Sequence, residues 1–171
     1  IDRVVEDVLS IARRERPALE PIDVARFLES VIPELVVMSG ADRRRVEVVL
    51  SSAEPILFDP GQLRQVLVNL LGNALRYASD APGAVRIEWR RGASDRLELR
   101  VSDDGPGLPP GMIEHVFEPF FTTESRGTGL GLYLAREFCA ANSAVLRYET
   151  SLDAASHRGA FVLVAAEPGA A

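Results

Sequence analysis

Two asparagines, Asn69 and Asn73, lie four residues apart in the apolar segment QVLVNLLGNALRYA. Residues with this spacing share one face of a helix, so the two amides are one turn from each other. Asn is a weak helix former, and a buried amide among Leu and Val needs a polar partner. An amide oxygen also suits Mg²⁺, which takes further ligands from water and substrate phosphates. The pair therefore indicates either a metal- and phosphate-binding face or two core amides bonded to backbone.

Arg76 and Tyr77 follow Asn73 by about one helical turn. A guanidinium at this place can bind a phosphate, and a tyrosine ring can stack on a flat ligand. Both residues therefore extend the candidate site toward the end of the same helix.

Two glycine-rich segments, DDGPGLP at residues 103–109 and GTGLGL at residues 127–132, are the next candidates. Each alone is typical of a turn. The second precedes a predicted helix, where glycines allow backbone N–H groups to approach an anion. It differs from a Walker loop, since no Lys-Ser or Lys-Thr pair follows the glycines. It also differs from the dinucleotide fingerprint, because its glycines occupy every second position.

Asp103 ends a predicted strand in which Leu97, Leu99 and Val101 alternate with polar residues. Because side chains alternate across a strand, the carboxylate points to the same interior side as the three apolar residues. A buried carboxylate there can accept a hydrogen bond from an exocyclic amine such as that of adenine. The alternative is a turn or capping carboxylate.

The segments that must position these residues are predicted from the spacing of their apolar residues, which is typical of a helix in some segments and of a strand in others. Asp23 and Asp59-Pro60 are expected to start helices, and Pro33 to kink or end the first of them. Their order indicates an α+β two-layer sandwich, with a mixed and mostly antiparallel sheet. The expected helices are 1–16, the one begun by Asp23, 61–78, a short one ending at 116, and 128–141; the expected strands are 19–22, 46–50, 55–58, 84–90, 96–102, 145–150 and 159–165.

Composition narrows the function classes. A chain of 171 residues with 47% hydrophobic residues suits one globular domain. The net charge of −6 argues against nucleic acid as a partner. Two His and one Cys cannot supply a four-ligand zinc site, and Cys139 is interpreted as a buried small hydrophobe. No apolar run approaches the length of a membrane span, so a cytoplasmic domain is expected.

The ordered motifs Asn-x-x-x-Asn, Asp-x-Gly-x-Gly, Phe-x-Pro-Phe-Phe and Gly-x-Gly-x-Gly resemble the four boxes of the histidine kinase catalytic domain. That domain belongs to the ATP-binding superfamily shared with Hsp90, MutL and type II topoisomerases, and the resemblance implies its Bergerat-type fold, with helices on one face of the sheet. The segments FDPGQLRQVLVNLLGNALRYA and FFTTESRGTGLGLYLAREFCAAN look similar to kinases that govern type IV pilus genes or the nitrogen response.

The resemblance assigns roles to the candidate residues, with ATP and Mg²⁺ as cofactors. It implies that Asn73 binds magnesium and that Asn69, Arg76 and Arg126 form the catalytic set. A solvated surface arginine is the alternative for Arg126. The remaining nucleotide contacts implied are Tyr77, Asp103, Gly105, Gly107 and Leu108 around the base, Phe120 within the lid anchor 117–121, and Gly127, Thr128, Gly129, Leu130, Gly131 and Leu132 around the phosphates.

The same resemblance implies transfer of the γ-phosphate to a histidine on an upstream dimerisation and phosphoacceptor domain of the same protein. Residues 1–16 would be the end of that domain's helix and residues 17–171 the catalytic domain. His115 and His157 lack the acceptor context and are interpreted as surface or structural residues. The implied partner is a response regulator, with the sigma-54 activator type as the finer expectation. The full-length protein is expected to be a homodimer, and an inner-membrane anchor is one option for it.

The sequence leaves three rival functions open. An ATP-driven clamp of the Hsp90 or MutL kind uses a Glu at the position of Asn69, and an amide cannot accept that proton. An anti-sigma-factor serine kinase and a non-catalytic nucleotide sensor share the same boxes. Departures from the family pattern also stand out. Thr122-Thr123-Glu124 replaces Thr-Thr-Lys, and Asn142-Ser143-Ala144 replaces His-Gly-Gly, where Asn is a residue type that can take the left-handed C-cap conformation.

Overall fold

The computed structural model describes residues 16–122, 127–150 and 157–165. The helix expected over residues 1–16 falls, apart from Arg16, outside these ranges. In chain order the elements are β1 (Glu20–Ile22), α2 (Val24–Ser39), the 3-10 helix η1 (Arg43–Arg45), β2 (Val46–Leu50), β3 (Ile56–Phe58), α3 (Pro60–Tyr77), β4 (Val85–Arg91), β5 (Leu97–Asp103), α4 (Pro110–Ile113), α5 (Gly131–Ala141), β6 (Val145–Thr150) and β7 (Gly159–Val164).

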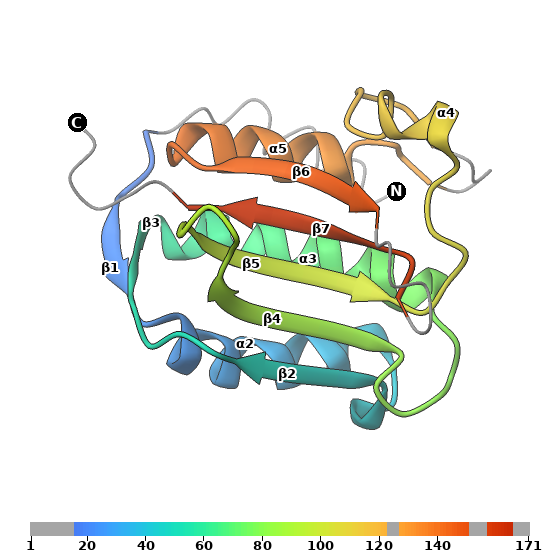
Figure 1. The fold of residues 1–171 in the computed structure, drawn as a ribbon, viewed down its shortest axis with the longest axis horizontal. Coiled ribbons are helices and arrows are strands. Elements are labelled where there is room, and N and C mark those ends of the chain that lie inside the picture. The colour runs from blue at the N-terminus through green and yellow to red at the C-terminus, as the bar shows by residue number, and fades with distance from the viewer. Residues whose placement is uncertain (1–15, 123–126, 151–156, 166–171) are drawn as a thin grey trace.

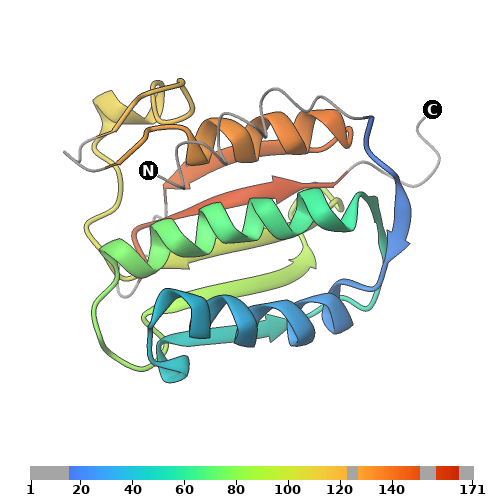
Figure 2. The same ribbon diagram turned by 180° about the vertical axis from the view of Figure 1, so that it is seen from behind.

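Five strands form one mixed sheet in the order β2-β4-β5-β7-β6 (Figure 1). Strands β2 and β4 are parallel, and every other neighbouring pair is antiparallel. Helices α2, α3 and α5 lie side by side across one face of this sheet (Figure 2). Strands β1 and β3 pair separately as a short antiparallel ladder. The expected α+β two-layer fold, with helices on one face, is confirmed.

Aspartates start the two long helices, as the sequence predicts. The Asp23 carboxylate accepts a hydrogen bond from the backbone N–H of Arg26, and the Asp59 carboxylate accepts one from Gln62. Such caps satisfy N–H groups that have no partner within the helix. Helix α2 continues past Pro33 to Ser39, so Pro33 does not end the helix.

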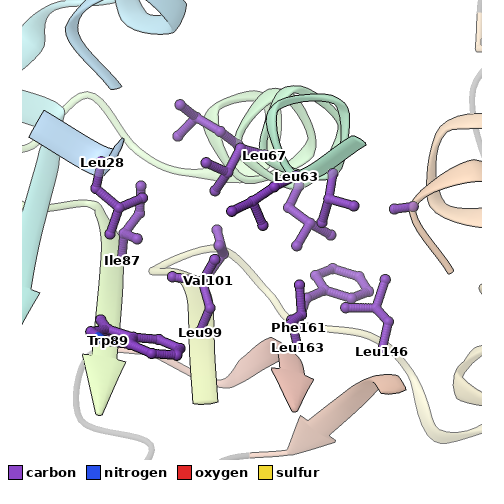
Figure 3. Packing of buried hydrophobic residues seen from close by; sticks show 14 of the residues in the cluster. Leu28, Leu63, Leu67, Ile87, Trp89, Leu99, Val101, Leu146, Phe161 and Leu163 are labelled. Carbon is purple, nitrogen blue, oxygen red and sulfur yellow. The ribbon is translucent and has the colours of Figure 1, made fainter. Parts of the chain in front are cut away.

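The core fills the space between the sheet and the three helices (Figure 3). Leu63 and Leu67 of α3 point down onto the strands, where Val101 and Phe161 face them. Each apolar position predicted for this helix is at most 9% exposed, which confirms the predicted face: Leu63, Val66, Leu67, Leu70, Leu71, Ala74 and Leu75. Because this stripe is buried, only the other face of α3 can present side chains to a ligand.

The opposite face of the sheet carries interleaved charges. Glu98 of β5 is only 3% exposed and forms ion pairs with Arg90, Arg100 and Arg147, at 3.5, 3.6 and 3.2 Å. A buried carboxylate needs such partners, because an unpaired buried charge costs several kcal/mol. None of the helices in the described ranges is both long and apolar enough to cross a membrane.

Helix α5 begins at Gly131, three residues later than predicted, because Thr128 to Leu130 form an irregular loop. Its end also differs from the prediction. Asn142 has φ −94°, and the left-handed residue is Ser143 at φ +56°. Asn142 therefore does not use the left-handed conformation that its residue type allows.

The reason is that the Asn142 side chain is buried and holds two helix ends together. Its oxygen accepts from the backbone N–H of Asp59 at 2.7 Å, and its amide donates to the side chain of Gln62 and the carbonyl of Phe138. The start of α3 and the end of α5 are thus joined by one amide.

Candidate nucleotide-binding site

The end of α3, the end of β5 and the start of α5, which carry or border the described site residues, lie at one end of the sheet (Figure 1, Figure 2). Helix α3 connects the two halves of this region. From Asn69 to Tyr77 the helix advances by about 12 Å, at 1.5 Å per residue. One half of the site therefore lies beside the middle of α3 and the other beside its C-terminal turn.

Asn69 and Asn73 are both half-buried on α3. Helix α5 passes close to Asn69, since a Cβ atom at Gly131 would lie 3.2 Å from the Asn69 Oδ1. Within the described residues, no hydrogen bond engages either side-chain amide. The interpretation of these residues as core amides bonded to backbone is therefore not supported. Their oxygens suit a hard cation.

The C-terminal turn of α3 packs tightly on the first glycine loop. A Cβ at Gly105 would lie 2.7 Å from the carbonyl oxygen of Tyr77 and 2.6 Å from Oδ1 of Asp103. Only glycine leaves room for this approach. The Tyr77 ring is 40% exposed, and Arg76 is exposed on the same turn. The contact fixes Tyr77 relative to Asp103.

Asp103 is half-buried at the end of β5, on the face that carries Leu99 and Val101. Its Oδ1 accepts the backbone N–H of Gly105 at 3.0 Å, as the turn interpretation expected. Burial raises the pKa of Asp103 above the usual aspartate value, while that N–H bond opposes the rise. No hydrogen bond from the described residues reaches Oδ2, so this oxygen can accept a ligand amine.

Asp104 lies directly after β5 and holds the C-terminal end of α3, which sequence reasoning missed. Its carboxylate accepts from the Ser79 backbone N–H at 2.8 Å and from the Ser79 hydroxyl at 2.5 Å. Burial raises the pKa of Asp104, but the bonds from Ser79 outweigh it and the net pKa is lowered. Ser79 lies 25 residues earlier in the sequence, so no local motif predicted these bonds.

The remainder of the first glycine loop is held from β6. Gly107 is left-handed at φ +72°, and the backbone N–H of Leu108 donates to the Tyr148 hydroxyl at 3.0 Å. The Leu108 side chain packs against the core. Tyr148 was also missed, because it lies 40 residues away in sequence and belongs to no motif.

The second glycine loop leads into α5. Its Thr128 hydroxyl accepts from the Leu130 N–H at 3.2 Å, and among the described residues the N-cap position, Leu130, has no side chain that caps the helix. Leu130 is buried, so it contributes backbone rather than side chain to the loop surface. Uncapped N–H groups at a helix N-terminus form a favourable place for an anion.

Gly129 brings the two ends of the predicted lid together. It is left-handed at φ +67° and its carbonyl accepts from the Phe120 N–H at 3.0 Å. Phe120 is itself left-handed and its ring is 73% exposed. Gly127 and Leu132 are half-buried on either side of this contact. Arg126, expected to be the lid cation, lies outside the described residues.

The remaining titratable groups offer little competing chemistry. His115 is exposed and its Nδ1 lies 2.9 Å from Glu118, which raises the pKa of the imidazole. Burial raises the pKa of the Cys139 thiol to about 12. The described residues contain no group of three or more His, Cys, Asp or Glu that could hold a metal ion. A cation at this site would therefore depend on amide and phosphate oxygens.

The comparisons with known proteins agree with this geometry. Residues 58–166 match the family described as histidine kinase-, DNA gyrase B-, and HSP90-like ATPase. The sensor protein kinase PilS of Pseudomonas aeruginosa is 41% identical over 150 residues, which cover 85% of this chain and 28% of PilS. The sensory histidine kinase/phosphatase NtrB of Rhodobacter capsulatus is 31% identical over 162 residues, which cover 88% of this chain and 46% of NtrB.

A solved structure shows the same likeness in three dimensions. Full-length ShkA in complex with AMPPNP superposes with a TM-score of 0.74 and 32% identity, over 95% of this chain and 35% of that chain. The chain thus spans less than half the length of each of these relatives. It belongs to the family of histidine kinase-, DNA gyrase B- and HSP90-like ATPases, and within it the chain is the ATP-binding catalytic domain of a two-component sensor histidine kinase.

Proposed function

We propose that this domain binds Mg-ATP between α3, the loop after β5 and the start of α5, and transfers the γ-phosphate to a histidine of an acceptor helix. The observation that carries the proposal is the pair of half-buried amides on α3, with Gly131 of α5 against Asn69. Two hard oxygen ligands and an uncapped helix start beside them suit a magnesium-bound polyphosphate.

The base end of the nucleotide is assigned to Asp103, Gly105, Gly107, Leu108 and Tyr77. Oδ2 of Asp103 is the acceptor for the adenine amine, and the close packing at Gly105 holds that carboxylate beside Tyr77. A half-buried acceptor discriminates well, because a ligand without the amine leaves it unpaired.

The phosphate end is assigned to Asn69, Asn73 and Arg76 on α3 and to the loop residues Gly127, Thr128, Gly129, Leu130, Gly131 and Leu132. Asn73 is the proposed magnesium ligand. Bound magnesium would neutralise phosphate charge, which is its usual contribution to phosphoryl transfer. Arg76 adds a cation on the last turn of α3, and Arg126 is proposed as a second one. Phosphoryl transfer needs little covalent chemistry from the protein, so positioning and charge supply most of the effect.

The receiving histidine is proposed to lie on an acceptor domain rather than at His115 or His157. His115 is tied to Glu118, and His157 interacts electrostatically with Asp103 at the base end of the site. The likeness to PilS and NtrB supports a response regulator as the next recipient of the phosphate, with the sigma-54 activator type as the specific proposal. A homodimer of the full-length protein is proposed on the same grounds.

A binding measurement tests the nucleotide site. Titration of ATP with and without Mg²⁺ should show magnesium-dependent binding that Asn73→Ala and Asp103→Ala each weaken at least about tenfold, the loss expected for a charged or metal-linked contact. Asn73→Ala should remove most of the magnesium dependence, whereas Asp103→Ala should leave it. Unchanged affinity in both variants would contradict the assignment.

A transfer experiment tests the reaction. Incubation with γ-labelled ATP and a separately produced acceptor-helix fragment should label the fragment, with the acid-labile and base-stable behaviour of phosphohistidine. Rapid release of inorganic phosphate without labelling would instead favour an ATPase of the clamp type.

A further inference from the structure

The side chain of Tyr148 reaches from β6 to the first glycine loop. Tyr148 pairs with Phe161 of β7, and its hydroxyl accepts the backbone N–H of Leu108 at 3.0 Å. The proposed function places the peptide between Gly107 and Leu108 beside the adenine ring. This peptide is therefore held by a residue from a strand that is distant in sequence.

One glycine, Gly159, makes room for the phenol, and Gly107 lies beside it. A Cβ at Gly159 would collide with the hydroxyl oxygen of Tyr148, and a Cβ at Gly107 would lie 3.4 Å from it. The hydroxyl thus occupies a space that exists only because Gly159 lacks a side chain, whereas the distance to Gly107 is an ordinary contact. This explains why β7 opens with glycine, although Gly159 needs no left-handed conformation.

The ring of Tyr148 is fixed by other aromatic residues. It packs edge-on against Phe161 with ring centroids 5.1 Å apart, and Phe161 packs in the same manner against Phe117 at 5.9 Å. Phe161 lies in the core beneath α3 (Figure 3). Because the ring is supported in this way, the hydroxyl has a defined position, and removing it leaves the packing intact.

We propose that Tyr148 is a positioning residue for nucleotide binding, which fixes the Gly107–Leu108 peptide through its hydroxyl and so holds the base pocket in its binding conformation. This inference rests on the proposed function. A loop already held in the bound conformation loses less freedom when the ligand arrives, so its affinity is higher. The Leu108 N–H in turn requires an acceptor in this half-buried place.

The test compares ligands that do and do not use the base pocket. Tyr148→Phe removes only the hydroxyl, and Kd is measured by calorimetry for ATP, ADP and inorganic tripolyphosphate. We expect ATP and ADP to bind about three- to tenfold more weakly, by a similar factor, the loss typical of one hydrogen bond. Tripolyphosphate should bind with unchanged affinity. If Tyr148 only stabilised the fold, Tyr148→Phe would change the Kd of all three ligands by the same factor.

Two further variants sharpen the result. Gly159→Ala keeps the hydroxyl but pushes it away from Leu108, so it should reproduce the loss for ATP and ADP. Tyr133→Phe removes the hydroxyl of another half-buried tyrosine and serves as the matched control, with all three affinities unchanged.

The outcomes separate this inference from the proposed function. If the unaltered chain binds ATP and Tyr148→Phe binds ATP and ADP as tightly, only the role of Tyr148 is overturned. An equal loss for tripolyphosphate, or an equal loss in Tyr133→Phe, would overturn it as well. Failure of the unaltered chain to bind ATP would overturn both proposals.

Discussion

The backbone N–H of Phe120 donates to the carbonyl of Gly129 at 3.0 Å, and both residues adopt the left-handed backbone conformation. A Cβ at Gly129 would collide with the carbonyl carbon of Phe120 and lie 2.7 Å from its Cα. The obstacle is backbone and cannot rotate away. The residues on either side of the predicted lid are thus joined at a contact that only glycine permits.

Gly129→Ala should therefore separate Phe120 from Gly129 and weaken ATP binding more than about tenfold, since it moves both flanks of the phosphate loop. The left-handed backbone adds a cost of about 1 kcal/mol to the folded state. Calorimetric titration with Mg-ATP measures the affinity, and urea denaturation followed by the fluorescence of buried Trp89 measures stability.

Gly83→Ala is the matched control for this change. Gly83 is also left-handed, at φ +71°, but a Cβ there would meet nothing within 4 Å. It should show the backbone cost of about 1 kcal/mol without loss of ATP affinity. Equal affinity in the two variants would show that the contact with Phe120 is unimportant for binding.

The bonds between Asp104 and Ser79 predict a coupled pair. Ser79→Ala and Asp104→Ala should each lower the free energy of unfolding by about 1 kcal/mol, because each removes the same hydrogen bonds. The double variant should cost little more than either single variant. ATP affinity should fall several-fold in both, since Tyr77 and Asp103 lose their common anchor. A double-mutant cycle in urea, with titration of each variant, measures both effects.

Asp80→Ala controls for the loss of a nearby negative charge. Asp80 follows Ser79 directly, yet its side chain is 97% exposed and its ion pair with Arg45 is 3.4 Å long. Exposed pairs contribute little, so this variant should behave like the unaltered chain within about 0.5 kcal/mol. Additive effects of Ser79→Ala and Asp104→Ala would contradict the coupling.

Asn142→Ala should be strongly destabilising, by about 2–4 kcal/mol, with little change in ATP affinity. The change leaves the Asp59 N–H, the Gln62 side chain and the Phe138 carbonyl without their partner in a buried place. These groups lie where α3 begins, at the other end of the helix from Tyr77. Gln62→Ala removes one of the bonds and should cost about 1 kcal/mol. A large loss of ATP affinity in Asn142→Ala, measured where the variant is fully folded, would contradict this separation of stability from binding.

The raised pKa of Asp103 predicts a pH dependence of nucleotide binding. As the pH falls, this carboxylate takes up a proton at a higher pH than an ordinary aspartate, and the protonated group is a poorer acceptor for the adenine amine. The affinity for ADP should therefore fall as the pH is lowered and Asp103 becomes protonated. Because the folded-state pKa lies above the unfolded value, protonation of this group favours the fold, so the loss should precede acid unfolding.

Asp103→Asn provides the reference for that titration. The ratio of ADP affinities between the unaltered chain and this variant should approach one as the pH is lowered from 8 toward about 5, which cancels titration of the phosphates themselves. Trp89 fluorescence at each pH verifies that both proteins stay folded. A ratio that stays constant over the whole range would contradict a role for the Asp103 charge.

The amino-acid sequence by itself determined the elements and the chemical character of the site. Periodicity places the buried stripe of α3, and Asp59 with Pro60 marks its start, because these are local properties of backbone and side chain. The motif around Asn73, the carboxylate at the end of β5 and the glycine loops likewise depend on short spacings. These features were sufficient to indicate the family.

Only the tertiary structure decided which residues join the elements of the fold and hold the site in place. Tyr148 meets Leu108, Asn142 meets Asp59, and Asp104 meets Ser79 across 25 to 83 residues of chain, and no local pattern encodes such contacts. The same reason explains why Asn142 is not left-handed, since its conformation follows from bonds to another helix rather than from the preference of Asn at a helix end. Local energies select the elements, whereas long-range packing and buried hydrogen bonds select how those elements meet.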